Sequence, residues 1–281
     1  MMQSPDIGSM IFQHTADSHF LEIPFYGELR LPTGWRLFGV DVSPTKHVVF
    51  MMLAAFLVWL TVFVAGRSVE KRHRERKGPA GFGAGVEAVA LFVRDDVAIA
   101  NIGHNGRKFA PYIMTLFFFV LYCNLLGLFP YMATPTGNIV VTGTLAILSF
   151  LITEISGFIA LGPKGYLKTI VFIPPGMTGI GAFFMALLMT PIELISKLVK
   201  PFALCLRLFA NMTAGHFVIL ALLGLIFIFA TMGPVVLGVV TIGSLAFVIF
   251  MMLLELLVAF LQAYIFALLT SVFIGLLQHE H

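Results

Sequence analysis

Long runs of hydrophobic residues, separated by short polar segments, dominate this chain. The first run covers 48–66 and contains no Lys, Arg, Asp or Glu. At ~1.5 Å per helical residue it is about long enough to cross a hydrocarbon core ~30 Å thick. Two later runs, 109–131 and 139–161, are joined by a link without charged residues. The pattern predicts three transmembrane helices, at about 47–66, 109–131 and 139–161, and the last two form a hairpin.

The last part of the chain holds two much longer hydrophobic runs. They cover about 177–231 and about 235–278, and Gly233-Pro234 separates them. As a single helix the final run would measure roughly 65 Å, about twice the hydrocarbon thickness. No polar loop interrupts it, so it either bends or crosses at a tilt well beyond the usual ~20°. We favour two long, strongly tilted helices, which suit the curved side of a cylindrical partner.

A more polar segment lies between the first span and the hairpin. It mixes Val, Leu, Phe and Ile with four charged residues: Glu87, Arg94, Asp95 and Asp96. Those charges disfavour a membrane crossing, because ionised side chains are costly in hydrocarbon. We therefore expect an amphipathic helix along the membrane interface at about 86–104.

The overall composition agrees with a membrane protein. The 281 residues are 59% hydrophobic and 11% charged, with a mean hydropathy of +0.99. Soluble domains average roughly 45–50% apolar and about 25% charged residues. We predict an all-α integral membrane protein with an external N-terminal tail at 1–46 and a single membrane domain at 47–281. The first helix should stand perpendicular to the membrane.

The placement of charge predicts the orientation of the chain. Lys and Arg crowd the segment 67–77, whereas the N-terminal tail begins with four acidic residues before its first basic residue, Arg30: Asp6, Asp17, Glu22 and Glu28. Basic loops stay in the cytoplasm, so the N-terminus is predicted outside and the C-terminus inside. The next inner link carries Lys164 and Lys168, in agreement with this orientation.

A lone arginine, Arg207, lies inside the apolar sequence. No Lys, Arg, Asp or Glu follows it from 208 to 254. An arginine at membrane depth costs about 2.5–3.5 kcal/mol on insertion scales and is kept where it faces water, a buried partner or an ion path. The alternative is a helix-end arginine whose charge snorkels to the interface.

A polar stripe leads to this arginine. At 100° per residue four side chains share one helix face: Glu193, Ser196, Lys200 and Arg207. Asn211 extends the same face by one turn. The stripe would run from the inner membrane surface to the middle of the membrane. Glu193 and Lys200 alone would equally fit a helix that begins at the headgroups.

A second polar patch is predicted across the hairpin that turns at Gly233-Pro234. Counting along both helices puts His216 and Glu255 at similar depth, and the same count pairs Arg207 with Gln262. A His–Glu pair can relay protons because histidine titrates near neutral pH. Arginine keeps its proton in proteins, so Arg207 is suited to be a fixed positive gate and not a relay.

At these residues the chain resembles the a subunit of the F-type ATP synthase. The segment 206–216, with the sequence LRLFANMTAGH, carries the resemblance. Glu193 with Lys200-Pro201 upstream and the segment 261–266 downstream support it. Asn124 with Pro130 resembles the family's first hairpin. Some bacterial members carry Glu and His at the two paired positions. The order here, His216 with Glu255, resembles the mitochondrial and alphaproteobacterial type.

The resemblance implies a stator beside a rotating ring of c subunits. Arg207 would be the gate opposite the ring carboxylate. The outer half-channel and gate would further comprise Asn211, His216, Glu255 and Gln262. The inner half-channel would comprise Glu193, Ser196 and Lys200, and Asn124 would have a supporting role.

The resemblance also implies the setting of the protein. Expected partners are the c-ring, the peripheral-stalk b subunits, the rest of the ATP synthase and the lipid bilayer of a bacterial inner membrane, with no nucleic acid. The chain would not be an enzyme by itself, and we expect no cofactor and no metal. It has no G-x-x-x-x-G-K-[S/T] nucleotide motif, so proton flow here would be coupled to ATP synthesis elsewhere in the complex.

Two other functions fit parts of the sequence. One is a self-contained secondary transporter that uses Arg207 with His216 and Glu255 for an anionic substrate. The other is a purely structural membrane anchor, in which Arg207 has no functional role. Protons are favoured over Na⁺ as the transported ion.

Overall fold

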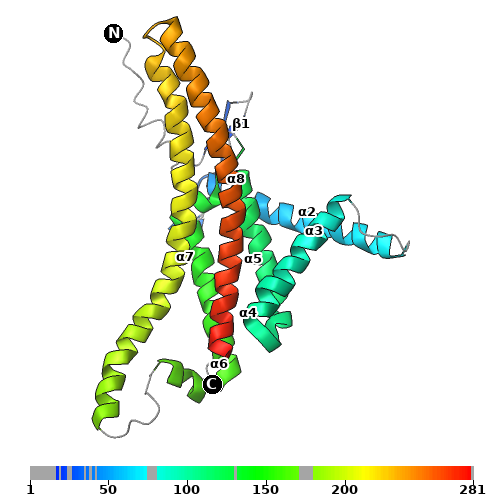
Figure 1. Ribbon diagram of the computed structural model, residues 1–281, viewed down its shortest axis with the longest axis vertical. Helices are drawn as coiled ribbons and strands as arrows, with labels where there is room; N and C mark the ends of the chain where they lie inside the picture. Colours follow the sequence, from blue (N-terminus) through cyan, green and yellow to red (C-terminus); the bar gives the residue numbers. More distant parts are fainter. Residues whose placement is uncertain are drawn as a thin grey trace. The chain divides into compact units, whose positions relative to one another are not determined.

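Helices make up most of the computed structural model of this chain (Figure 1). The structure describes residues 17–18, 20–23, 27–34, 36–37, 40–41, 43–74, 81–129, 132–170 and 180–279. In the described residues the long apolar runs are helical, as their composition and periodicity predict. The described residues therefore form an all-α fold, apart from two small hairpins near the N-terminus.

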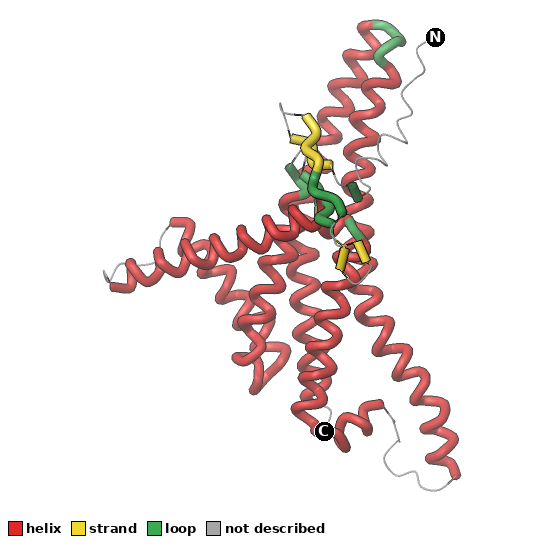
Figure 2. Tube along the Cα trace, turned by 180° about the vertical axis from the view of Figure 1, so that it is seen from behind, coloured by secondary structure: helices red, strands yellow, loops and turns green. Residues whose placement is uncertain are grey.

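Two short antiparallel hairpins occupy part of the segment predicted to be an external tail (Figure 2). Strand β1 (Phe20–Ile23) pairs with β2 (Gly27–Arg30), and β3 (Arg36–Leu37) pairs with β4 (Val40–Asp41). The backbone N–H of Lys46 donates to the carbonyl of Ser18 at 3.0 Å. This bond ties the tail to the start of the first helix. The pattern of hydrophobic residues predicts no regular structure in this part of the chain.

The first helices cover the predicted span and the predicted interfacial segment. Their bounds are α2 Lys46–Arg74, α3 Gly81–Phe92, the π-helix η1 Val93–Ile99, α4 Ala100–Ile102, the 3₁₀ turn η2 Gly103–Asn105 and α5 Gly106–Leu126. Helix α2 continues beyond the predicted end at 66 into the basic segment. The interval 86–104 is not one regular helix, because a π-helical stretch and a 3₁₀ turn interrupt it.

Helix α6 (Ile139–Ile170) follows the 3₁₀ turn η3 (Pro135–Gly137) and extends beyond the predicted end at 161. It contains a kink at Gly162, whose φ is +68°. Glycine adopts this conformation without the steric cost that other residues incur. Pro163 follows and has no backbone N–H to donate, so the regular ladder is interrupted at this point.

The two longest helices are α7 (Ile180–Phe229), with 50 residues, and α8 (Pro234–His279), with 46. At 1.5 Å per residue they measure roughly 75 Å and 70 Å. Between them Gly233 has a φ of +102°, and Pro234 begins α8, where its fixed φ fits the first helical turn. The adjoining halves of α7 and α8 run antiparallel and side by side (Figures 1 and 2).

Five stretches among the described residues are long and apolar enough to cross a membrane. They are Lys46–Lys71, Gly81–Leu126, Ile139–Thr169, Phe183–Phe229 and Pro234–Gln278. Large apolar side chains along them are exposed in the isolated chain, for example Val235 at 78% and Ile159 at 76%. Such surfaces are stable in lipid and not in water. The chain is a multi-pass membrane protein.

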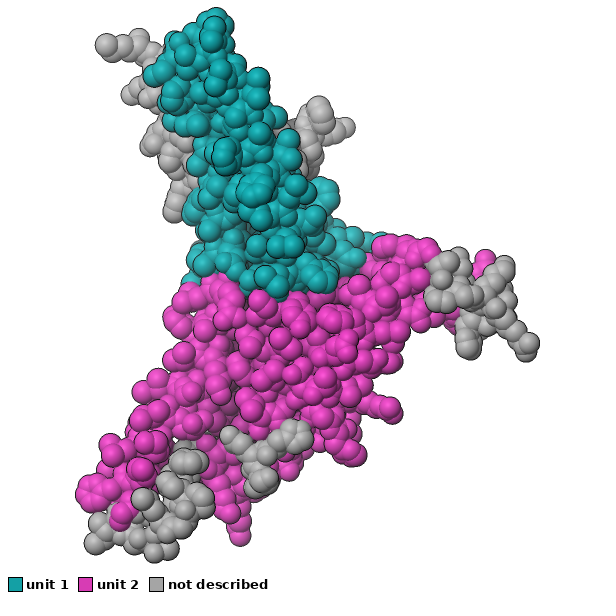
Figure 3. All heavy atoms as spheres, in the orientation of Figure 1, with its two compact units in different colours: residues 1–60, 119–141, 208–263 teal, residues 61–118, 142–207, 264–281 magenta. Residues whose placement is uncertain are grey.

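The chain divides into two compact units (Figure 3). Unit 1 comprises residues 1–60, 119–141 and 208–263, and unit 2 comprises 61–118, 142–207 and 264–281. Each long helix contributes to both, and in α7 the boundary falls between Arg207 and Leu208. In unit 1, the start of α2 packs on the end of α5, where Ala54, Cys123 and Leu126 are buried together.

Candidate functional site

A charged pair lies inside unit 1, on the hairpin of α7 and α8. Nδ1 of His216 is 3.0 Å from Oε1 of Glu255, and the Glu255 side chain is only 4% exposed. The close approach depends on Gly215, since a Cβ there would lie 3.0 Å from the same carboxylate oxygen. The structure thus brings together the two residues that helix counting put at similar depth.

The link between α5 and α6 holds the other side of the imidazole. Oγ1 of Thr134 lies 3.2 Å from Nε2 of His216. The next hydroxyl along the link, Thr136, donates to Oδ1 of Asn124 at 2.7 Å, and the Asn124 amide donates to the carbonyl of Ala259 at 3.2 Å. These buried bonds fasten the link to α5 and α8 beside the charged pair.

The buried side-chain polar atoms without a hydrogen-bond partner in the described residues all belong to this neighbourhood. They are Nδ1 of His47, Oγ1 of Thr213, Nδ1 of His216 and both carboxylate oxygens of Glu255. The His216–Glu255 contact is therefore close but lacks hydrogen-bond geometry, and it is an ion pair when His216 is protonated. A cavity of about 50 Å³ is lined by residues that include His47, Thr134, Thr213 and His216. Buried polar groups without protein partners usually bind ordered water.

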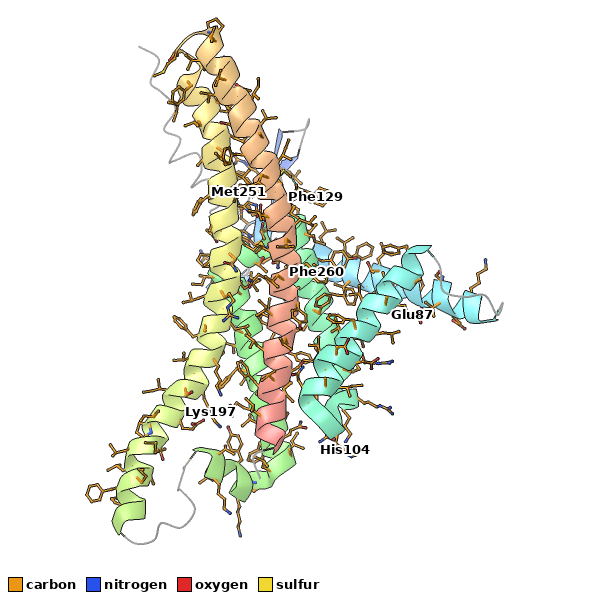
Figure 4. All side chains as sticks on the ribbon, viewed as in Figure 1. Glu87, His104, Phe129, Lys197, Met251 and Phe260 are labelled. Carbon is orange, nitrogen blue, oxygen red and sulfur yellow. The ribbon has the colours of Figure 1, made fainter. Side chains whose placement is uncertain are left out.

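A second charged cluster lies inside unit 2, on α6 and α7. Nζ of Lys197 is 3.8 Å from Oε2 of Glu154, and the two side chains are 10% and 16% exposed. Lys197 also donates to Oγ1 of Thr169 at 3.2 Å and lies 5.0 Å from the ring centre of Tyr166. The Tyr166 hydroxyl donates to the same Glu154 oxygen. Figure 4 labels Lys197 on α7.

This cluster borders a cavity of about 70 Å³ in unit 2. Its charged lining residues are Glu154, Glu193, Lys197 and Lys200. Ser149, Thr153 and Thr270 also line it. Carboxylate, ammonium and hydroxyl side chains therefore border a cavity large enough for water inside an otherwise apolar protein.

The remaining predicted residues have different surroundings. Ser196 is exposed and does not line the cavity of unit 2. Arg207 is exposed on α7 and makes no hydrogen bond or ion pair among the described residues. Asn211 is half-buried, and Gln262 on α8 is 6% exposed.

Sequence reasoning missed several polar residues at these sites, among them His47, Thr134, Glu154 and Lys197. Two of them carried a signal in the sequence. Lys197 follows Glu193 by one helical turn, and Glu154 is a lone acid in an apolar run, which calls for a partner. No group of three His, Cys, Asp or Glu side chains that could hold a metal ion occurs in the described part of the chain.

An all-α membrane protein with ionisable residues inside its long helices is typical of proteins that translocate ions. The family model described as ATP synthase A chain matches residues 48–275. The chain belongs to the ATP synthase subunit a family, which associates it with ATP synthesis and proton transport.

Several relatives are similar over most of the chain. ATP synthase subunit a of Chloroherpeton thalassium is 46% identical over 95% of this chain and 76% of its own length. ATP synthase subunit a 2 of Chlorobaculum tepidum is 45% identical over 96% of this chain and 72% of its own length. The subunit of Myxococcus xanthus is 45% identical over 86% of this chain and 76% of its own length.

Proposed function

We propose that this chain is the proton-conducting stator of an F-type ATP synthase membrane sector. It forms two half-channels beside a ring of c subunits and couples proton flow to rotation of the ring and to ATP synthesis. The observation that carries this proposal is the ion pair of His216 and Glu255, with a distance of 3.0 Å inside apolar helices. Buried ionisable groups in a membrane are costly and mark ion or proton paths.

The outer half-channel is assigned to unit 1. His216 exchanges a proton with cavity water, and Glu255 stabilises the imidazolium that forms. Asn211 and Gln262 continue the polar path along α7 and α8 toward the ring carboxylate. Asn124 has a supporting role, since its amide bonds the carbonyl of Ala259 on α8 and accepts from Thr136.

The inner half-channel is assigned to the cavity of unit 2. Glu193 and Lys200 both line that cavity, and water within it would carry protons away from the ring. Ser196 is exposed on α7, so its contribution would be to a surface in contact with the ring. Glu154 and Lys197, which line the same cavity, add a second pair of charges to the path.

Arg207 is the gate. A guanidinium does not release its proton, so it cannot pass protons on, and its charge favours a deprotonated carboxylate nearby. Its exposure and its lack of an internal partner among the described residues leave it free to pair with a ring carboxylate. A potential of 100 mV supplies ~2.3 kcal/mol for each charge that crosses the membrane.

The proposed setting is a bacterial inner membrane with the N-terminus outside. The basic segment that follows the first span supports a cytoplasmic loop there. The first span stands perpendicular to the membrane, and the long halves of α7 and α8 are tilted against the c-ring. Peripheral-stalk b subunits hold the chain still while the ring turns.

ATP-driven proton pumping in inverted membrane vesicles tests the proposal. Arg207→Ala should abolish pumping, followed by quenching of an acid-sensitive dye, while the complex still assembles. Arg107→Ala is the matched control, because Arg107 is exposed on α5 and outside both cavities. Normal pumping by assembled Arg207→Ala would contradict the proposal and favour the anchor. Solute transport by the chain reconstituted alone would favour a secondary transporter.

A further inference from the structure

His47 is a buried histidine whose role the proposed function leaves open. It lies in the first turn of α2 and is 4% exposed. Its Nε2 is 3.9 Å from Oδ1 of Asp17, and Asp17 is itself partly exposed. Its Nδ1 is buried and has no hydrogen-bond partner among the described residues. A histidine kept only for packing would be expected to have both polar atoms satisfied.

The neighbourhood of His47 explains the unsatisfied nitrogen. His47 lines the cavity of about 50 Å³ in unit 1 together with His216 and Thr213. The buried polar atoms that have no protein hydrogen bond in the described part of the chain belong to these three residues and to Glu255, the partner of His216. The residues that carry most of these atoms therefore line the same cavity in unit 1. Its size and polarity suit ordered water, which needs two to four polar partners.

We propose that His47 is a further proton-relay residue, and that water in this cavity connects it to His216. The inference rests on the proposed function, because it extends the outer half-channel toward the N-terminal segment. Asp17 lies on the exposed side of His47, and the cavity water lies on its other side. The path then runs from Asp17 through His47 and water to His216.

The proton balance of this step is simple. A neutral His47 ring that carries its proton on Nδ1 accepts a second proton at Nε2, on the side of Asp17. The imidazolium then releases the Nδ1 proton to cavity water, and that water passes a proton on to His216. One proton enters and one leaves, and the ring ends with its proton on Nε2. Exchange of that proton from Nε2 to Nδ1 through water restores the starting tautomer.

The other residues that line this cavity do not carry protons. Met132, Ala133, Gly137 and Met212 line the rest of the cavity, and none of them has a side chain that exchanges protons. Thr134 and Thr213 present hydroxyls, which hold water but do not take a charge at neutral pH. Of the residues that line this cavity, His47 and His216 are therefore the two that can carry a proton.

The test measures ATP synthesis by the whole complex in proteoliposomes. A potassium–valinomycin potential at equal pH on both sides drives it, so that an added buffer does not collapse the driving force. His47→Ala should lower the rate at least roughly tenfold, within the range usual for loss of a proton-transfer group. Imidazole should restore much of the rate by occupying the space that the side chain leaves. A morpholine buffer of similar pKa, too bulky for that space, should not.

Two further variants show whether a low rate in His47→Ala comes from the loss of a proton-transfer group or from misfolding. His47→Gln keeps most of the side-chain volume and a hydrogen-bonding group but cannot carry a proton. It should assemble normally, show a low rate and gain nothing from imidazole. His104→Ala is the matched control, since His104 is exposed and lies outside both cavities. It should retain the native rate.

His216→Ala separates this inference from the function on which it rests. Loss of synthesis in His216→Ala together with a native rate in His47→Gln would overturn the role of His47 alone. A native rate in assembled His216→Ala would contradict the proposed half-channel itself. A low rate in His47→Ala that imidazole leaves unchanged would identify His47 as a structural residue and overturn the relay.

Discussion

Nδ1 of His216 lies 3.0 Å from Oε1 of Glu255, across the hairpin that α7 and α8 form in unit 1. Neither residue could be ionised alone at this depth without a large desolvation cost. Together they lower that cost, because an imidazolium beside a carboxylate is neutral as a pair. A proton added to His216 is therefore tolerated where a lone buried charge would not be. For proton transfer, the presence of an acid beside an imidazole therefore matters more than which of the two helices carries each residue.

Exchange of the two side chains tests whether the pair acts as a unit. His216→Ala and Glu255→Ala should each lower ATP-driven proton pumping by roughly tenfold or more. The double variant His216→Glu with Glu255→His should pump markedly better than His216→Glu or Glu255→His alone, because it restores one acid beside one imidazole. Pumping is followed by dye quenching in inverted vesicles. A double variant no better than its parents would show that the two residues act independently.

Replacing Gly215 by side chains of increasing size tests how closely the Glu255 carboxylate must be positioned. A Cβ there would lie 3.0 Å from Oε1 and 3.1 Å from Cδ of Glu255. Gly215→Ala should shift the carboxylate by a few tenths of an ångström and reduce pumping slightly. Gly215→Val should reduce it by roughly tenfold or more, because small displacements of reacting groups are costly.

The matched control for the steric test is Gly66→Val on α2, where a Cβ would meet nothing within 4 Å. This variant should pump at the native rate. Equal rates for Gly215→Val and Gly66→Val would show that the position of the Glu255 carboxylate does not limit proton flow.

Arg207→Lys tests whether the positive charge at the proposed gate must be permanent. Lysine loses its proton readily in a low-dielectric site, whereas arginine does not. We expect pumping by Arg207→Lys to be as low as pumping by Arg207→Ala, in complexes that assemble to the same level. Full activity of the lysine variant would mean that any positive charge suffices at this position.

The sequence predicted those features that depend on one helix or one hairpin. Helix periodicity and the break at Gly233 were enough to pair His216 with Glu255, since depth follows directly from counting residues along two antiparallel helices. The long helices were predicted for the same reason. The kink at Gly162 was not predicted, although a glycine followed by a proline is a local signal for such a break.

Features that depend on packing between distant segments were not predicted. Lys197 meets Glu154 only because α6 lies against α7 within unit 2. The predicted polar stripe named Ser196, but the face that lines the cavity runs through Glu193, Lys197 and Lys200. An ideal 100° rotation does not specify which edge of a broad stripe faces a neighbouring helix. His47 was overlooked because its cavity is built from α2, α7 and the link before α6.

The ion pair of Glu154 and Lys197 predicts a measurable coupling in stability. Lys197→Met leaves a largely buried carboxylate without its cation, and the loss of a partner for a buried polar group costs about 1–3 kcal/mol. Glu154→Gln leaves the ammonium unpaired and should destabilise by a similar amount. The double variant leaves neither charge behind, so it should recover most of the loss.

Thermal unfolding of the detergent-solubilised complex measures these effects as a double-mutant cycle. We expect a coupling energy between Glu154 and Lys197 of about 1 kcal/mol or more, as for residues in direct contact. Lys164→Met is the matched control, because Lys164 lies on the same helix as Glu154 but is exposed. It should change stability by no more than about 0.5 kcal/mol. Additive losses in the double variant would mean that the 3.8 Å contact contributes nothing to the stability of unit 2.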